Sequence, residues 1–283
     1  MGSEVARVKQ RSASRKLVED LFEDSQRVYV VHYSCESFYG TNKTGGSTRV
    51  TSIAIRNLRS AQTRSWSIHK SAELQGCLGK IDENFPELEK AMLEGYFEFL
   101  RQHSNCRFVH WNMRDENYGF FALEHRMRTL GGTPFELQDD RKVDLARILV
   151  EIYGRQYASH VSESGRKGRI FSIVELNHIA DQDGLTGAQE AEAFVNGEYL
   201  KLHQSTLRKL DMFSNIFERM HAKNLKTSGS WFDVNGIHPV YIIEQIKAHW
   251  LTTLIIVSGG LISAAVKYWD AISKIWGAGN GSA

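Results

Sequence analysis

One apolar stretch near the N-terminus constrains the fold more than any other part of the sequence. Residues Arg27 to Tyr39 read RVYVVHYSCESFY. With the side-chain period of two that a strand imposes, apolar residues fall on both faces of this run. Strands that are apolar on both faces lie in the middle of a sheet that is covered on both sides. We therefore expect a central strand that presents one carboxylate, Glu36, at its far end.

The segments that follow predict an antiparallel meander and then a parallel strand. Val50–Leu58 and Arg64–His69 read as the second and third strands, each preceded by a short polar turn. Asn84–His103 has apolar residues at helical spacing, and Arg107–Trp111 reads as a buried strand. A crossover helix would place that strand parallel to the first. Further helices are expected over residues 117–130, 143–153, 173–180, 187–194 and 197–220. The predicted fold class is therefore α/β, a mixed sheet flanked by helices.

Composition narrows the classes of function. A formal net charge of +2 over 283 residues is too small to indicate nucleic-acid binding by bulk charge. Cys35, Cys77 and Cys106 lack metal-ligand spacing and are typical of reduced thiols in a cytosolic domain. Residues 1–16 have no apolar core, so we expect no N-terminal signal peptide.

Short acidic motifs occur in an order that resembles a known superfamily. Ser34-Cys35-Glu36 ends the first strand, Asn112-Met113-Arg114-Asp115 follows the parallel strand, and Asp211 lies on the late helix. Over residues 27–221 the chain resembles the 3′–5′ exonucleases with four acidic ligands. That resemblance implies a ribonuclease-H-like fold, with an Asp-x-Glu motif on the first strand and the last acid on a late helix.

Two departures from the family pattern bear on catalysis. Ser34 stands where the family has its first Asp. The last motif usually carries Tyr four residues, or His five residues, before its Asp, and this chain has Leu207 and Thr206 there. Hydrolysis by two divalent ions requires several anionic oxygen ligands and a group that orients the attacking water. The departures therefore predict impaired catalysis.

The resemblance still implies a set of candidate site residues. The catalytic candidates are Glu36, Asp115, Asp211 and His203. The substrate-binding candidates are Ser34 and Asn112. Candidate ligands for Mg²⁺ or Mn²⁺ are Glu36, Asp115 and Asp211, with Asp144 as a weaker fourth. Simpler roles compete with these: a surface ion pair for Glu36, a helix N-cap for Asp115 and a solvated helix position for Asp211.

The C-terminal region contains an uncharged stretch, residues 250–266, WLTTLIIVSGGLISAAV. As a helix, at about 1.5 Å per residue, it would be about 25 Å long. Trp250, Tyr268 and Trp269 flank it, as aromatic residues flank membrane spans. We expect a transmembrane tail anchor that self-associates through Gly260 and Ala264. The alternative is a buried or oligomerising helix of a soluble cytoplasmic protein.

Together these features predict four parts. They are a basic arm with a short helix (1–26), an exonuclease-like domain (27–221), a linker (222–245) and a hydrophobic helix (246–276) that holds the domain at the cytoplasmic face of a membrane. The favoured function is an exonuclease-like sensor or effector, for example in bacterial defence, that binds nucleic acid or a nucleotide. Two alternatives stay open: an active metal-dependent 3′–5′ exonuclease, and a non-catalytic scaffold that binds protein.

Overall fold

A central sheet of five strands organises the protein, as a computed structural model shows for residues 4–36, 47–113, 118–229 and 250–279. The strand order is β3-β2-β1-β4-β5. The first three strands pair antiparallel, and β4 and β5 run parallel to β1. This confirms the α/β class, the central position of the first strand, the meander and the parallel fourth strand. The strands are β1 (Val28–Cys35), β2 (Val50–Asn57), β3 (Thr63–Ser67), β4 (Arg107–His110) and β5 (Lys142–Asp144).

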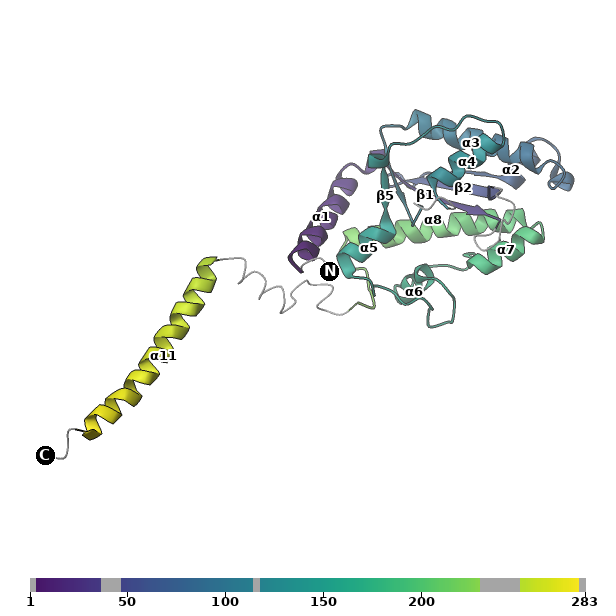
Figure 1. The fold of residues 1–283 in the computed structure, drawn as a ribbon. Helices are drawn as coiled ribbons and strands as arrows, with labels where there is room; N and C mark the ends of the chain where they lie inside the picture. The colour runs from purple at the N-terminus through teal and green to yellow at the C-terminus, as the bar shows by residue number, and fades with distance from the viewer. Residues whose placement is uncertain (1–3, 37–46, 114–117, 230–249, 280–283) are drawn as a thin grey trace. The chain divides into compact units, whose positions relative to one another are not determined.

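Helices cover both faces of the sheet (Figure 1). The long helix α8 lies against β1 and β2 on one face, and α3 packs on the other together with α2 and α4. The helices are α1 (Glu4–Glu23), α2 (Ile68–Leu74), α3 (Phe85–Gln102), α4 (Phe120–Thr129), α5 (Leu145–Tyr153), α6 (Arg169–Leu176), α7 (Gly187–Val195), α8 (Tyr199–His221) and α11 (Trp250–Gly279).

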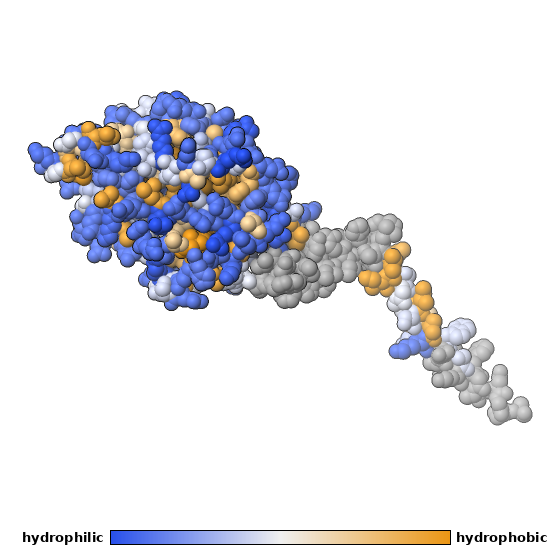
Figure 2. Space-filling model, turned by 180° about the vertical axis from the view of Figure 1, so that it is seen from behind, coloured by the Kyte–Doolittle hydropathy of each residue, from blue (hydrophilic) through white to orange (hydrophobic). Residues whose placement is uncertain are grey.

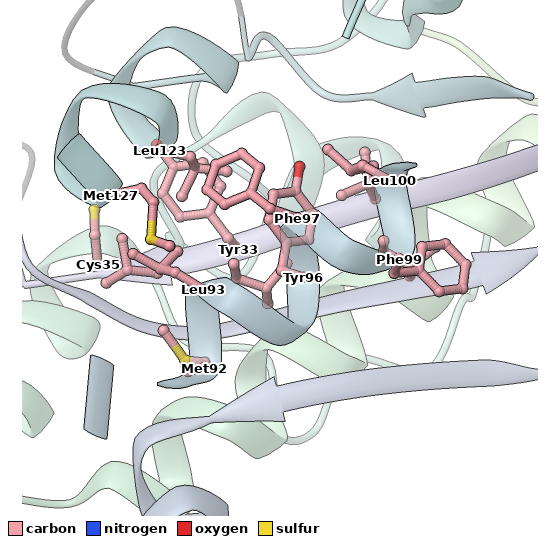
Figure 3. Packing of buried hydrophobic residues seen from close by; sticks show 14 of the residues in the cluster. Tyr33, Cys35, Met92, Leu93, Tyr96, Phe97, Phe99, Leu100, Leu123 and Met127 are labelled. Atoms are coloured by element: carbon pink, nitrogen blue, oxygen red, sulfur yellow. The ribbon is translucent and has the colours of Figure 1, made fainter. Parts of the chain in front are cut away.

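The alternation of β1 divides its side chains between these two layers. Tyr33 and Cys35 point into the apolar core beneath α3 and α4, where Figure 3 shows them among the side chains of Met92, Leu93 and Met127. His32 and Ser34 point to the opposite face, toward α8. Burial of the core side chains contributes roughly 1.5–3 kcal/mol for each large one. The side chains of His32 and Ser34 are thus placed on the α8 face of the sheet, opposite this apolar core.

Two short elements differ from the sequence prediction. The third strand ends at Ser67 rather than His69, because the Ser67 hydroxyl accepts a hydrogen bond from the Lys70 N–H and caps α2. β5 was not predicted, and its residues were assigned to the start of a helix. A strand of three residues is too short to show a period of two, and Asp144 ends it by capping α5.

The N-terminal segment is helical over most of its length, not only at its end as predicted. In the part from Arg11 onward, Val18 and Leu21 are buried, and so are Arg11 and Ser14 on the same helical stripe. The Ser14 hydroxyl donates to a carboxylate oxygen of Glu151 at 2.6 Å. The stripe was missed in the sequence because polar residues occupy half of it.

The domain extends past α8 into the predicted linker. Leu225 is buried, the side chain of Asn177 exchanges two hydrogen bonds with the backbone of Lys226, and the Ser228 N–H donates to the carbonyl of Tyr157. Residues 225–228 of the predicted linker therefore pack against the domain. The part of the linker from residue 230, and residues 246–249 of the predicted hydrophobic helix, lie outside the described residues.

The predicted C-terminal helix is confirmed from Trp250 and continues to Gly279. Its described apolar side chains are 55% to 74% exposed, and several are orange in Figure 2. They are Leu254, Ile255, Ile256, Val257, Leu261, Ile262, Val266, Tyr268 and Trp269. Among the described residues no helix is both long enough and apolar enough to cross a lipid bilayer.

Candidate functional site

Ser34, which stands where the resemblance implies a metal-binding Asp, is completely buried. Its hydroxyl donates to a carboxylate oxygen of Glu190 at 3.0 Å and lies 2.8 Å from the hydroxyl of Thr206. Thr206 also lies 2.5 Å from the hydroxyl of Ser52 on β2. Two of the positions at which this chain departs from the exonuclease pattern, Ser34 and Thr206, are therefore hydrogen-bonded to each other.

Glu190 is the centre of this group. One of its carboxylate oxygens accepts hydrogen bonds from the hydroxyls of Ser34 and Ser205, and lies 2.8 Å from the Lys209 ammonium. The side chains of Glu190 and Lys209 are only 4% and 10% exposed. We call Ser34, Ser52, Glu190, Ser205, Thr206 and Lys209 the polar cluster. A buried ion pair satisfied in this way is costly to break, because either charge left alone would stay buried without a partner.

Aromatic side chains close the space beside the polar cluster. The ring of His32 lies edge-on to Phe213 at 5.1 Å, and Trp111 stacks on Phe213 at 5.2 Å. The Tyr118 hydroxyl lies 3.2 Å from His32 Nδ1. Burial, helped by the charge of Lys209, holds the pKa of His32 well below its usual value. His32 is therefore a neutral, enclosed side chain and not an exposed base.

Glu36 forms an ion pair at the end of β1, which is the simpler of the two roles predicted for it. Its carboxylate accepts hydrogen bonds from the backbone N–H and the Nε of Arg49, at 3.0 and 2.7 Å. The Arg49 guanidinium in turn lies over the ring of Phe194 at 4.6 Å. Both carboxylate oxygens of Glu36 therefore have a partner on the neighbouring strand.

Asp211 lies near the opposite end of β1. It pairs with Arg56, whose strand partner is Val30, and more distantly with Arg208. At about 3.3 Å per residue, the Cα atoms of Val30 and Glu36 are about 20 Å apart along the strand. The structure therefore does not bring Asp211 and Glu36 together. The α8 residue that meets Ser34 is Thr206, more than one helical turn before Asp211.

Asp144 and Asn112 are in contact, but the Asp144 side chain bonds to the backbone of Asn112. The Asp144 side chain accepts hydrogen bonds from the N–H groups of Ala146 and Arg147, which makes it the N-cap of α5. The same oxygen accepts from the Asn112 N–H at 3.2 Å. Asn112 has a φ of +53°, a conformation that Asn tolerates better than most residues. Asp144 thus holds the turn after β4 against the start of α5.

His203, the candidate catalytic histidine, lies against the edge strand of the sheet. Its Nε2 is 3.0 Å from the hydroxyl of Ser65 on β3, and its ring is 5.0 Å from that of His69. Burial, helped by the positive charge nearby, lowers the pKa of His203 to about 4. It is thus a neutral, packed side chain, and no hydrogen bond or ion pair joins it to Glu36, Asp144 or Asp211.

The described carboxylates do not form a site for a divalent ion. Asp115 lies outside the described residues. In the described ranges, no three His, Cys, Asp or Glu side chains gather closely enough to hold a metal ion. Glu36, Asp144 and Asp211 each have a different set of partners, so the ligand set that Mg²⁺ or Mn²⁺ would need is not assembled from them.

Sequence reasoning missed Glu190 and treated Lys209 only as a surface neighbour of Asp211. A signal for both was present. Glu190 is three residues before the buried Ala193, and Lys209 falls on the stripe Leu202, Thr206, Phe213. A charged residue on the apolar stripe of a helix is rarely buried unless it is paired. One acid and one base on the stripes of two successive helices therefore indicate a buried pair.

Comparisons of this chain with protein-family models, with curated proteins and with solved structures found no match.

Proposed function

We propose that this protein is a non-hydrolytic relative of the 3′–5′ exonucleases that binds nucleic acid or a nucleotide as a sensor or effector, for example in defence. The proposal includes a ribonuclease-H-like origin of the domain. Its support is the central first strand, the antiparallel meander, the parallel strand after a crossover helix, and the late helix against the sheet, all in the chain order that the resemblance implies.

The observation that carries the loss of hydrolysis is the burial of Ser34 in the polar cluster. At the position of the first acid there is a hydroxyl bonded to Glu190 and Thr206, with no exposed atom. A metal ligand must direct a free lone pair at an ion that water can also reach. One oxygen of the Glu190 carboxylate that neutralises Lys209 already contacts three donors, the hydroxyls of Ser34 and Ser205 and the Lys209 ammonium.

Attachment to a membrane is the second part of the proposal. Its support is α11, whose apolar side chains between Leu254 and Val266 are more than half exposed. Exposed apolar side chains gathered on one helix are typical of a surface that contacts a membrane or another protein. Attachment of this kind would hold the domain at the cytoplasmic face of a membrane. A second copy of the same helix is the alternative partner. Carbonate extraction of membranes tests this part, and release of the full-length protein into the supernatant would exclude it.

An incubation with labelled single-stranded DNA and RNA tests the main proposal. With full-length protein and Mn²⁺ we expect the strand to keep its length while it shifts to a bound form in a native gel. Glu36→Gln should behave like the wild type in both readouts. Shortening from the 3′ end that Glu36→Gln abolishes would instead establish the active exonuclease. If the strand is neither shortened nor bound, the remaining alternative is a scaffold that binds protein.

A further inference from the structure

A depression of about 800 Å³ opens at the amino end of β1, remote from Glu36. Its walls are the β2–β3 turn, the first residues of β1 and the C-terminal end of α3. Tyr29 and Asn57, which face each other across β1 and β2, lie at its base. Depressions of roughly 300–1,000 Å³ are the usual size for sites that bind small molecules.

The charge of this depression is positive. Arg59 and Arg64 line it, and no Asp or Glu does so among the described residues. Neither arginine forms an ion pair with a carboxylate of the described residues, whereas Arg49, Arg56 and Arg208 each do. Arginine donors without a carboxylate partner are the groups that proteins use to bind phosphate.

Arg64 is oriented by aromatic rings. Its guanidinium lies 5.6 Å from the ring centre of Trp66 and 5.7 Å from that of Phe99. A guanidinium within about 6 Å of a ring centre is attracted by the ring, and it carries five N–H donors that a ligand can accept from. Arg64 is thereby held over the depression although it is exposed to solvent.

The same wall offers aromatic surface. The half-buried ring of Tyr29 packs edge-on against Phe99 and His103, both at 5.3 Å. His103 stacks on Phe99 at 4.0 Å, and its Nδ1 donates to the Phe99 carbonyl. The ring is therefore fixed, and a planar group can stack against this wall. Stacking on aromatic side chains is a general means of binding nucleobases.

The turn that carries Arg59 is held in one shape. Asn57 Oδ1 accepts hydrogen bonds from the N–H groups of Arg59 and Ser60 and from the Ser60 hydroxyl. The Asn57 amide donates to the Gln26 carbonyl at 2.9 Å, which ties the turn to the start of β1. A site that is ordered before binding loses less entropy when the ligand arrives.

We infer that this depression binds a nucleoside phosphate, with Arg59 and Arg64 on the phosphate and the Tyr29–His103 wall against the base. The ligand is either a free nucleotide or the end of a single strand. The inference rests on the proposed function and places its binding surface at the amino end of β1. It predicts that binding needs no metal ion and none of Glu36, Asp144 and Asp211.

Fluorescence anisotropy in the presence of EDTA tests this assignment. Full-length protein is titrated against a fluorescent adenine nucleotide and, separately, against a fluorescein-labelled single-stranded DNA. The double variant Arg59→Gln/Arg64→Gln should weaken binding at least about tenfold, because two charge-assisted contacts are lost. The matched control Arg208→Gln removes an arginine that is already paired with Asp183, and should change the Kd less than about twofold. Both variants alter exposed or half-exposed side chains, so thermal melts should show that they stay folded.

The two probes separate the possible sources of the ligand. Tighter binding of the strand supports a nucleic-acid end, and equal or tighter binding of the nucleotide supports a free nucleotide. If the wild type binds but the double variant binds equally well, the assignment of the depression is wrong and the proposed function stands. If the wild type binds neither probe, the proposed function itself is wrong.

Discussion

The two ends of β1 differ in whether the positively charged side chains beside them are paired with carboxylates. At the carboxyl end, Lys209 is buried against Glu190, and Arg49 is bonded to Glu36. At the amino end, Arg59 and Arg64 face solvent and contact no carboxylate among the described residues. The resemblance placed the site at the carboxyl end, where each of these charges is neutralised within the chain.

The difference shows how buried polar groups at the end of a strand are satisfied without a metal ion. If the first acid of a metal site is replaced by a hydroxyl, the remaining polar groups of the strand still require hydrogen bonds once they are buried. Ser34, Thr206 and Glu190 supply those bonds to each other, and Lys209 balances the remaining charge. The carboxyl end is thereby a stabilising element, and the proposed binding site lies where the arginines have no carboxylate partner among the described residues. The predictions below test this contrast.

The largest effect is expected at the carboxyl end. Lys209→Met leaves the Glu190 carboxylate buried without its cation, and should lower the free energy of unfolding by about 3 kcal/mol. Urea denaturation measures the change. Lys201→Met is the matched control, because Lys201 pairs with Glu198 at the surface with 52% and 41% exposure, and it should cost less than about 1 kcal/mol. Equal effects of the two variants would contradict the structural role of the polar cluster.

We also expect Asp144 to stabilise the fold and not to bind a metal ion. Asp144→Ala removes the N-cap of α5 and should cost about 1–2 kcal/mol, whereas Asp144→Asn keeps a capping oxygen and should cost much less. Urea denaturation of both variants, with and without Mn²⁺, checks this. Stabilisation of the wild type by Mn²⁺ that is lost in Asp144→Asn would reveal a metal ligand instead of a cap.

The pH dependence of stability should reflect His203. Its folded pKa, about 4, lies below the value of 6.5 for an unperturbed histidine. The unfolded chain therefore takes up a proton first, and stability falls as the pH drops from 6.5 toward 4. We expect His203 to contribute about 1 kcal/mol of loss between pH 7 and pH 5, with allowance for solvent screening. His203→Gln, which can still bond to Ser65, should lose less stability over this interval. An unchanged pH profile in this variant would contradict the burial of His203.

The smallest effect is expected for Asp211. Its ion pair with Arg56 is partly exposed, so Asp211→Asn should change the free energy of unfolding by less than about 1 kcal/mol. Nucleotide binding should be unchanged, because neither Asp211 nor its partner Arg56 lines the depression. Anisotropy and urea denaturation measure the two quantities. A large loss of binding would mean that Asp211 takes part in the site after all.

The arrangement of the sheet was predictable from the sequence, because its signals are local. The apolar run Val28–Cys35, the short turn between β2 and β3 and the helical spacing in α3 each help to determine one element. Their order then leaves few ways to pair the strands. β5 and α1 escaped prediction for the opposite reason: one is too short to show a period, and the other buries polar residues on its stripe.

Which residues form the site was less predictable, because it depends on how α8 is aligned against β1, a segment far from it in the sequence. Thr206 and Asp211 are both on α8, and only the packing of that helix against β1 decides which of them meets Ser34. The sequence pattern favoured Asp211, since acids are the expected metal ligands. Helix α8 instead presents Thr206 to Ser34 and Lys209 to Glu190.

Manganese binding followed by electron paramagnetic resonance tests the central claim most directly. Free aqueous Mn²⁺ gives a signal that is lost when the ion binds to protein. With full-length wild-type protein we predict that the signal stays that of the free ion up to equimolar amounts, because the described carboxylates do not converge. Stoichiometric loss of the signal that Glu36→Gln restores would show that an intact metal site exists at the carboxyl end of β1 and would contradict the account.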